Sequence, residues 1–192
     1  MTLRKLQNTI LTPAFFTHQV QKLFCNEKPY QINIALARMV KRGDLVRIKK
    51  GLFRFLEREI DEFTLATLMY QPSYISLESA LHVYGMIPEE VMQVTSVTPI
   101  TTKKLNTGEG IFLYSKIQST LFFGYNKLQD SNSWLFYHLA KPEKALLDYI
   151  YVRRVKDLSS FRVDLSEIDR RLLFKYAREF PAWVQNITKE QL

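Results

Sequence analysis

Cysteine is almost absent from this sequence of 192 residues, in which Cys25 is the only one. A single thiol excludes an internal disulfide bond and a zinc site built from cysteines. Long hydrophobic runs are absent too, because charged residues interrupt every apolar stretch well before the ~18 residues that cross a membrane. The opening residues, MTLRKLQNTILTPAFF, lack an apolar block followed by a cleavage site of small residues. We therefore expect no membrane association and a reducing, cytoplasmic compartment.

Residue groups typical of catalysis are scarce as well. The three histidines are widely separated and match no metal-ligand spacing: His18, His82 and His138. Four residues could be combined into a nuclease site: Glu78, Glu143, Lys144 and Asp148. Simpler roles fit them better, because Glu143 would stabilise a helix N-terminus, and Lys144 and Asp148 at i, i+4 would form a surface ion pair. We expect a protein that is not an enzyme and that needs no metal or cofactor.

What the chain does have is positive charge, and this charge is unevenly distributed. Residues 1–57 contain eleven Lys or Arg and three Asp or Glu, a net charge of +8. Residues 58–192 contain sixteen of each sign and carry none. A basic first third joined to a neutral remainder indicates two domains, 1–57 and 58–192, of which the first meets a polyanion.

The basic third predicts three helices followed by a hairpin. Thr12 before Pro13 is typical of a helix start, so we expect a helix over residues 13–24. The next helix, 30–42, has one apolar face made by Ile32, Ala35, Leu36, Met39 and Val40. Two short strands joined by a glycine-containing turn follow at 45–55. This order of elements predicts a winged helix-turn-helix.

That arrangement predicts a contact with duplex DNA. The apolar residues of the hairpin, Leu45, Ile48, Leu52 and Phe53, would pack on the helices, and its basic residues would point to phosphates, whose neutralisation releases counterions. The helix from Tyr30 would enter the major groove, where Gln and Asn pair with adenine and Arg with guanine. The candidate DNA-binding residues are Lys28, Gln31, Asn33, Arg38, Lys41, Arg42, Arg47, Lys49, Lys50 and Arg54. A solvated charged face on a small helical domain is the alternative.

The remainder predicts an α+β domain of helices and strands. Strand-like runs lie at 91–99, 110–117, 121–128 and 133–140, and Ser166 is expected to cap a late helix. Aromatic residues on a sheet can stack single-stranded nucleic acid, but only Lys127 adds charge to these strands. We therefore expect Phe122, Trp134 and Phe136 in the core. A possible second basic patch comprises Arg153, Arg154, Lys156, Arg170 and Arg171; solvated helix faces are its alternative.

Several motifs resemble the abortive-infection type IV antitoxin family (AbiEi). The stretch YISLESALHVYGMI is followed by LAKPEKALLDYIYV, and both lie behind the basic hairpin that ends in KKGLFRF. In that family a serine-alanine-leucine helix closes on tyrosine-glycine, and a proline-glutamate-lysine-alanine-leucine-aspartate helix comes later. The matching positions here are Ser79, Ala80, Leu81, Tyr84, Gly85 and Pro142 to Asp148. The resemblance covers roughly residues 3–155.

The resemblance implies a protein with two tasks. The winged helix would repress its own operon by binding double-stranded DNA at repeated operator sites in its promoter. The second domain would counteract a nucleotidyltransferase-like toxin encoded alongside, with or without direct contact, and the second basic patch would then serve DNA or the toxin. A stand-alone transcriptional regulator without a toxin is the alternative, and a nuclease is the least favoured reading.

Overall fold

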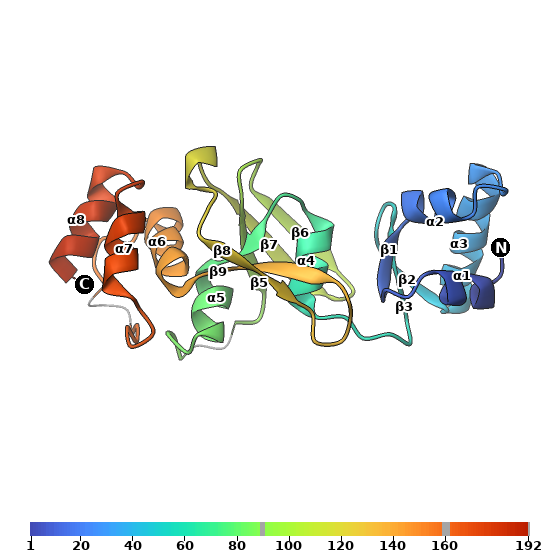
Figure 1. Ribbon diagram of the computed structural model, residues 1–192, viewed down its shortest axis with the longest axis horizontal. Coiled ribbons are helices and arrows are strands. Elements are labelled where there is room, and N and C mark those ends of the chain that lie inside the picture. The colour runs from blue at the N-terminus through green and yellow to red at the C-terminus, as the bar shows by residue number, and fades with distance from the viewer. Residues whose placement is uncertain (89–90, 159–161, 192) are drawn as a thin grey trace.

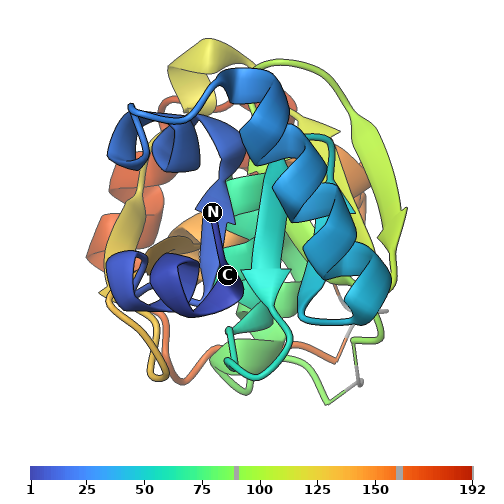
Figure 2. The same cartoon turned by 90° about the vertical axis from the view of Figure 1, so that its right-hand side faces the viewer.

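The computed structural model describes residues 1–88, 91–158 and 162–191, and its architecture is α+β. The N-terminal module (residues 1–57) combines three helices with a three-stranded antiparallel sheet of order β1-β3-β2 (Figure 1). Its elements are α1 (Leu3–Thr9), β1 (Ala14–Phe16), α2 (Thr17–Leu23), α3 (Pro29–Arg42), β2 (Leu45–Lys49) and β3 (Leu52–Phe55). Figure 2 looks onto this module, with α3 along one side of it.

The helix predicted from Pro13 begins later than expected. Residues 14–16 instead form β1, in which Phe15 lies opposite Phe53 of β3. The Phe15 side chain is buried, and its ring centroid lies 5.1 Å from that of Phe55. Pairing with a strand 38 residues away overrides the local Thr-Pro signal, and α2 starts only at Thr17. The side-chain oxygen of Gln19 accepts a hydrogen bond from the Phe16 N–H at this start (2.7 Å).

The β2–β3 hairpin buries both of its faces. Phe53 and Leu45 pack into the core of the N-terminal module with Ile32 of α3. Leu52 and Ile48 pack instead into the larger core of the C-terminal region (residues 58–192). The prediction that all four apolar hairpin residues pack on the helices is therefore wrong for Ile48 and Leu52. Successive residues of a strand point to opposite faces, so Leu52 and Phe53 cannot share one core.

The connection between the two parts is fixed by hydrogen bonds at both ends. Arg58 donates from Nη1 to the Ile10 carbonyl (2.6 Å) and from Nη2 to the Gln7 carbonyl (3.1 Å), and its guanidinium lies over the Phe55 ring. Asp61 caps the next helix by accepting from the Phe63 N–H (2.7 Å). The chain thus passes between the parts within a few residues.

The C-terminal region is built on a mixed six-stranded sheet of order β6-β7-β5-β4-β9-β8. Its strands are β4 (Tyr74–Ile75), β5 (Val94–Thr98), β6 (Lys103–Thr107), β7 (Gly110–Lys116), β8 (Tyr125–Gln129) and β9 (Phe136–Ala140). A 3-10 turn, η1 (Ser119–Leu121), precedes β8, and the helices are α4 (Glu62–Met69), α5 (Leu77–Val83), α6 (Pro142–Arg153), α7 (Arg170–Ala177) and α8 (Ala182–Gln191).

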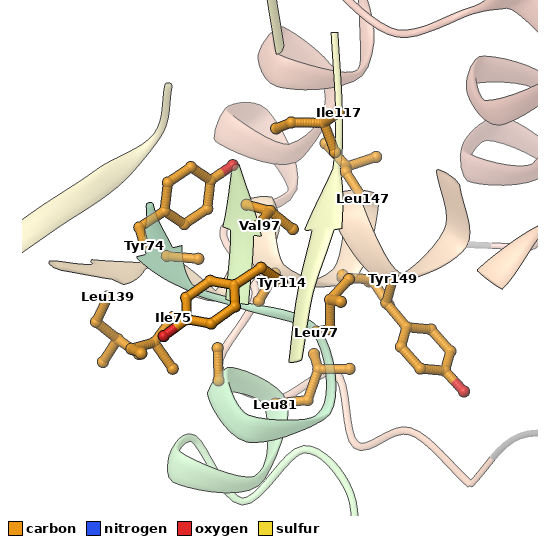
Figure 3. Close-up of a cluster of buried hydrophobic side chains, with 14 of the residues drawn as sticks. Tyr74, Ile75, Leu77, Leu81, Val97, Tyr114, Ile117, Leu139, Leu147 and Tyr149 are labelled. Carbon is orange, nitrogen blue, oxygen red and sulfur yellow. The ribbon is translucent and has the colours of Figure 1, made fainter. Parts of the chain in front are cut away.

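Helices cover both faces of this sheet. Tyr114 donates its hydroxyl hydrogen to the Ala66 carbonyl of α4 (2.7 Å), whereas Tyr74 donates to Asp148 of α6 (2.8 Å). Figure 3 shows the apolar side chains that fill the space between these layers. Helices α7 and α8 pack on the outer side of α6 (Figure 1). Asp169 rather than Ser166 caps α7, since its side chain accepts from the Arg171 N–H (2.8 Å).

Two aromatic residues expected in the core lie on the surface instead. Trp134 is 77% exposed and Phe136 is 42% exposed, whereas Phe122 is half-buried as predicted for a packed residue. The reason is the sheet order, which puts β8 at an edge with β9 beside it. Residues 131–135 form the connecting loop, so Trp134 does not belong to a strand. Among the described residues, no helix is long and apolar enough to span a membrane.

The expected surface ion pair between Lys144 and Asp148 is fully buried. Lys144 donates to Asp148 Oδ1 and to the Tyr74 hydroxyl (2.8 Å), and Ser76 donates to Asp148 Oδ2 (2.8 Å). Burial lowers the pKa of Lys144 and raises the pKa of Asp148, and their mutual attraction opposes both shifts. The i, i+4 spacing predicts contact between two side chains but not exposure, because α6 lies between the sheet and α7.

This buried pair generates a stability prediction. Lys144→Met keeps the length of the side chain but leaves the Asp148 carboxylate buried without its cation. We expect the free energy of unfolding to fall by about 3–5 kcal/mol, as measured by urea denaturation. Glu78→Gln is the matched control, since it weakens the exposed pair that Arg153 of the same helix makes with Glu78 (2.7 Å), and we expect a loss below about 1 kcal/mol. Similar losses in the two variants would contradict this interpretation.

Candidate nucleic-acid interface

The sequence of α3 explains both its start and its end. Pro29 occupies the first turn, where a missing N–H costs nothing. The side-chain oxygen of Gln31 accepts a hydrogen bond from the Lys28 N–H (3.2 Å), which satisfies one donor at the helix start. Gly43 ends the helix with φ of +81°, a left-handed conformation that suits glycine. Ile32 and Leu36 bury one side of α3 in the core.

The opposite side of α3 is an exposed ridge with two unexpected apolar residues. Tyr30 is 58% exposed and Ile34 is 46% exposed, although neither contributes to the core. The exposed ridge of α3 consists of Tyr30, Asn33, Ile34, Ala37, Arg38 and Lys41. Sequence reasoning chose only the polar members of this ridge. The missed residues could have been found from the same helical spacing, because they lie opposite the apolar face.

A groove of about 450 Å³ separates this ridge from the hairpin turn. Polar side chains line it from three elements: Gln21 comes from α2, Asn33 from α3, and Arg47 and Lys50 from the hairpin. Gly51 forms the turn with φ of +81°. Three of the candidate DNA-binding residues, Asn33, Arg47 and Lys50, thus line one groove together with Gln21, which was not a candidate.

Gln31 does not join this groove. Gln31 and Asn33 are two residues apart, which is about 200° around a helix, so their side chains leave opposite sides of α3. Gln31 lies in a separate hollow beside Arg38 and Glu27, and Glu27 binds the amino terminus of Met1 (2.9 Å). Gln31 was expected to read bases as Asn33 does, but its amide oxygen caps the helix and its side chain lies outside the groove that Asn33 lines.

Two predicted phosphate ligands face the C-terminal region instead. Lys49 donates to the Met69 carbonyl, and burial, followed by the nearby charge of Lys103, lowers its pKa. Arg54 forms an ion pair with Glu109 (2.9 Å) in which both side chains are largely buried. These two side chains lie on the same side of the hairpin as Leu52, so a phosphate backbone on the ridge side cannot reach them.

The remaining candidate cations lie at the surface. Arg42 is exposed, but it forms an ion pair with Asp44 (2.7 Å), which weakens it as a phosphate ligand. The other five cations are exposed: Lys28, Arg38, Lys41, Arg47 and Lys50. With the polar groups of the groove, they make a positive surface formed by the ridge of α3 and the hairpin turn.

The second basic patch does not form one surface. Arg153, at the end of α6, makes a bidentate pair with Glu78 (2.7 and 2.9 Å), and these hydrogen bonds raise its pKa. Asp169, which precedes Arg170 and Arg171, donates its N–H to Glu143 (3.0 Å) at the other end of α6. Ten residues of helix, about 15 Å, separate these ends. Arg154 lies over the Trp183 ring at 5.6 Å, and Lys156 is exposed nearby in sequence.

Metal chemistry and comparisons with known proteins add no further assignment. Within residues 1–88, 91–158 and 162–191, no three His, Cys, Asp or Glu side chains are grouped as metal ligands would be. No protein-family model matches the chain, and no curated protein matches it in sequence. Function must therefore be inferred from the residues and their geometry.

Proposed function

We propose that this protein is the DNA-binding antitoxin of a type IV toxin-antitoxin system. In this proposal the N-terminal module is a winged helix-turn-helix that represses its own operon in the cytoplasm, and α3 is its recognition helix. The observation that carries the proposal is the convergence of Asn33, Arg47 and Lys50 on one groove, within a module that holds the entire net charge of +8. A merely solvated face gives no reason for such convergence.

The exposed ridge of α3 supplies chemistry for the major groove. Asn33 can donate to and accept from the edge of an adenine, and the apolar side chains of Ile34 and Ala37 fit the methyl group of thymine. Arg47 and Lys50, on the hairpin, are placed to contact the flanking phosphates, which position the protein without reading sequence. Operator sites rich in A·T pairs opposite the centre of α3 are therefore expected.

The antitoxin part of the proposal rests on the motifs that resemble those of the AbiEi family. The contacts of these motif residues are internal: Ser79 accepts from the Thr95 N–H (2.8 Å), and Tyr84 donates to the Ala140 carbonyl (2.9 Å). Lys144 and Asp148 are bonded to each other inside the fold. Because these motif residues maintain the fold, we expect the region to oppose a toxin through its surface rather than by catalysis.

The first test is DNA binding by the full chain. We expect a mobility shift with duplex DNA from its own promoter, and an affinity that falls steeply from low to high salt. Arg47→Ala with Lys50→Ala should weaken operator and random DNA about equally, and should reduce the salt slope by roughly 1 per lost phosphate contact.

Asn33→Ala should instead cost about 1–3 kcal/mol of preference for operator over random DNA. Gln31→Ala is the matched control and should keep that preference. Binding that is indifferent to salt would contradict the proposal, as would a loss of preference in Gln31→Ala alone.

The second test separates repression from rescue. The expected toxin is a nucleotidyltransferase-like protein that an adjacent gene encodes. The variant carrying Arg47→Ala and Lys50→Ala should protect cells that express this toxin while it fails to repress the promoter. The full chain is preferable to residues 58–192 alone, because Ile48 and Leu52 complete the core of the C-terminal region. If rescue disappears together with repression, in a variant that circular dichroism shows to be folded, the protein is a transcriptional regulator without antitoxin activity.

A further inference from the structure

The β8–β9 hairpin carries aromatic side chains that the fold leaves uncovered. It forms one edge of the six-stranded sheet. Phe136, at the start of β9, is 42% exposed, and Trp134, two residues earlier in the loop, is 77% exposed. Large apolar side chains at this exposure contribute little to folding, and their contribution to a bound partner would be larger.

Phe136 continues a row of rings that begins in the core. The buried Tyr74 stacks on Tyr125 of β8 with ring centroids 4.6 Å apart. Tyr125 in turn meets the edge of His138 at 5.4 Å. Lys127 lies directly opposite His138 across the strands, and its ammonium is 4.1 Å from the centroid of the Phe136 ring. Rings therefore run outward along one face of the hairpin, and a cation lies among the outermost ones.

The charged and aromatic side chains of this face fit a ligand that carries both negative charge and exposed aromatic rings. Lys127 is exposed, and its flexible side chain can carry the ammonium from the Phe136 ring to a phosphate. Burial, and then the nearby charge of Lys127, lower the pKa of His138, which favours the neutral form of its ring. A neutral ring between aromatic neighbours can stack on a base without a competing charge.

The hairpin lies close to the connection between the two parts of the chain. Asp130, which directly follows β8, accepts a hydrogen bond from the Asp61 N–H of the connection between the two parts (3.1 Å). The loop between β8 and β9 therefore lies beside that connection, on the side of the C-terminal region that faces the N-terminal module (Figure 1).

We propose that the exposed face of the β8–β9 hairpin binds single-stranded RNA, with bases stacked on Phe136 and Trp134 and a phosphate on Lys127. Sheet-borne aromatic residues next to a cation recognise unpaired bases, which are characteristic of RNA loops and ends. Duplex DNA does not fit this face, because its bases are stacked inside the helix. This activity is independent of DNA recognition by α3.

Trp134 itself can report the binding. The chain has two tryptophans, and the other, Trp183, is half-buried and stacked on Tyr151 (6.1 Å). Trp183→Phe therefore leaves Trp134 as the sole tryptophan emitter. In the full chain with this change, an unstructured RNA 12-mer of mixed sequence should quench Trp134 fluorescence. A blunt DNA duplex should leave it unchanged even when fluorescence anisotropy shows that the duplex is bound.

Variants give the decisive comparison. Trp134→Ala with Phe136→Ala should weaken binding of the labelled RNA by at least about tenfold, the scale of one lost base-ring stack, with duplex binding changed less than about twofold. Phe174→Ala on α7 is the matched control, since Phe174 is 37% exposed and should be neutral in both assays. The proposal is overturned if the RNA does not bind, if it binds without quenching Trp134, if the double variant keeps its affinity, or if single-stranded DNA of the same sequence binds more tightly.

Discussion

The three-stranded sheet of the N-terminal module must complete two hydrophobic cores at once. Strand geometry imposes this constraint, because successive side chains leave a strand on opposite faces. Phe53 closes the core under the helices, and its neighbour Leu52 closes the core of the C-terminal region. Both are buried, and each contributes on the order of 2 kcal/mol through the hydrophobic effect. The Arg54–Glu109 ion pair and the bond from Lys49 to the Met69 carbonyl add polar contacts on the same face.

Under the proposed function, this constraint decides which side of the module can meet DNA. The sheet face with Lys49 and Arg54 is occupied by the C-terminal region, so the exposed ridge of α3 and the hairpin turn form the remaining positive surface. The proposed recognition surface is therefore held by a sheet that is packed on both faces rather than by a freely hinged module. In this account the C-terminal region determines how the N-terminal module approaches the duplex.

Short-range sequence patterns predicted helices and strands well, but they predicted less well which face of each element is buried. The periodicity of residues 30–42 and the stop at Gly43 gave α3 within a residue of its observed bounds. Such patterns do not reveal pairing between strands that are distant in sequence. Residues 14–16, which form β1, were therefore predicted as part of a helix, and β6 was not predicted. Exposure depended on the sheet order, which turned an expected surface pair, Lys144–Asp148, into a buried one and brought Trp134 to the surface. Of the candidate DNA-binding residues, Asn33, Arg47 and Lys50 line one groove, whereas Lys49 of β2 and Arg54 of β3 face the C-terminal region, because a strand directs successive side chains to opposite faces.

Amide hydrogen exchange of the full chain, free and bound to duplex DNA from its own promoter, tests most directly whether the module binds DNA while docked. The account predicts slower exchange in residues 29–41 and in the turn at 50–51 when DNA is bound. Exchange should stay unchanged in residues 65–69 and 103–109, where the C-terminal region meets the hairpin. Faster exchange in these two segments on DNA binding would mean that the module leaves its place to bind, and would contradict the account.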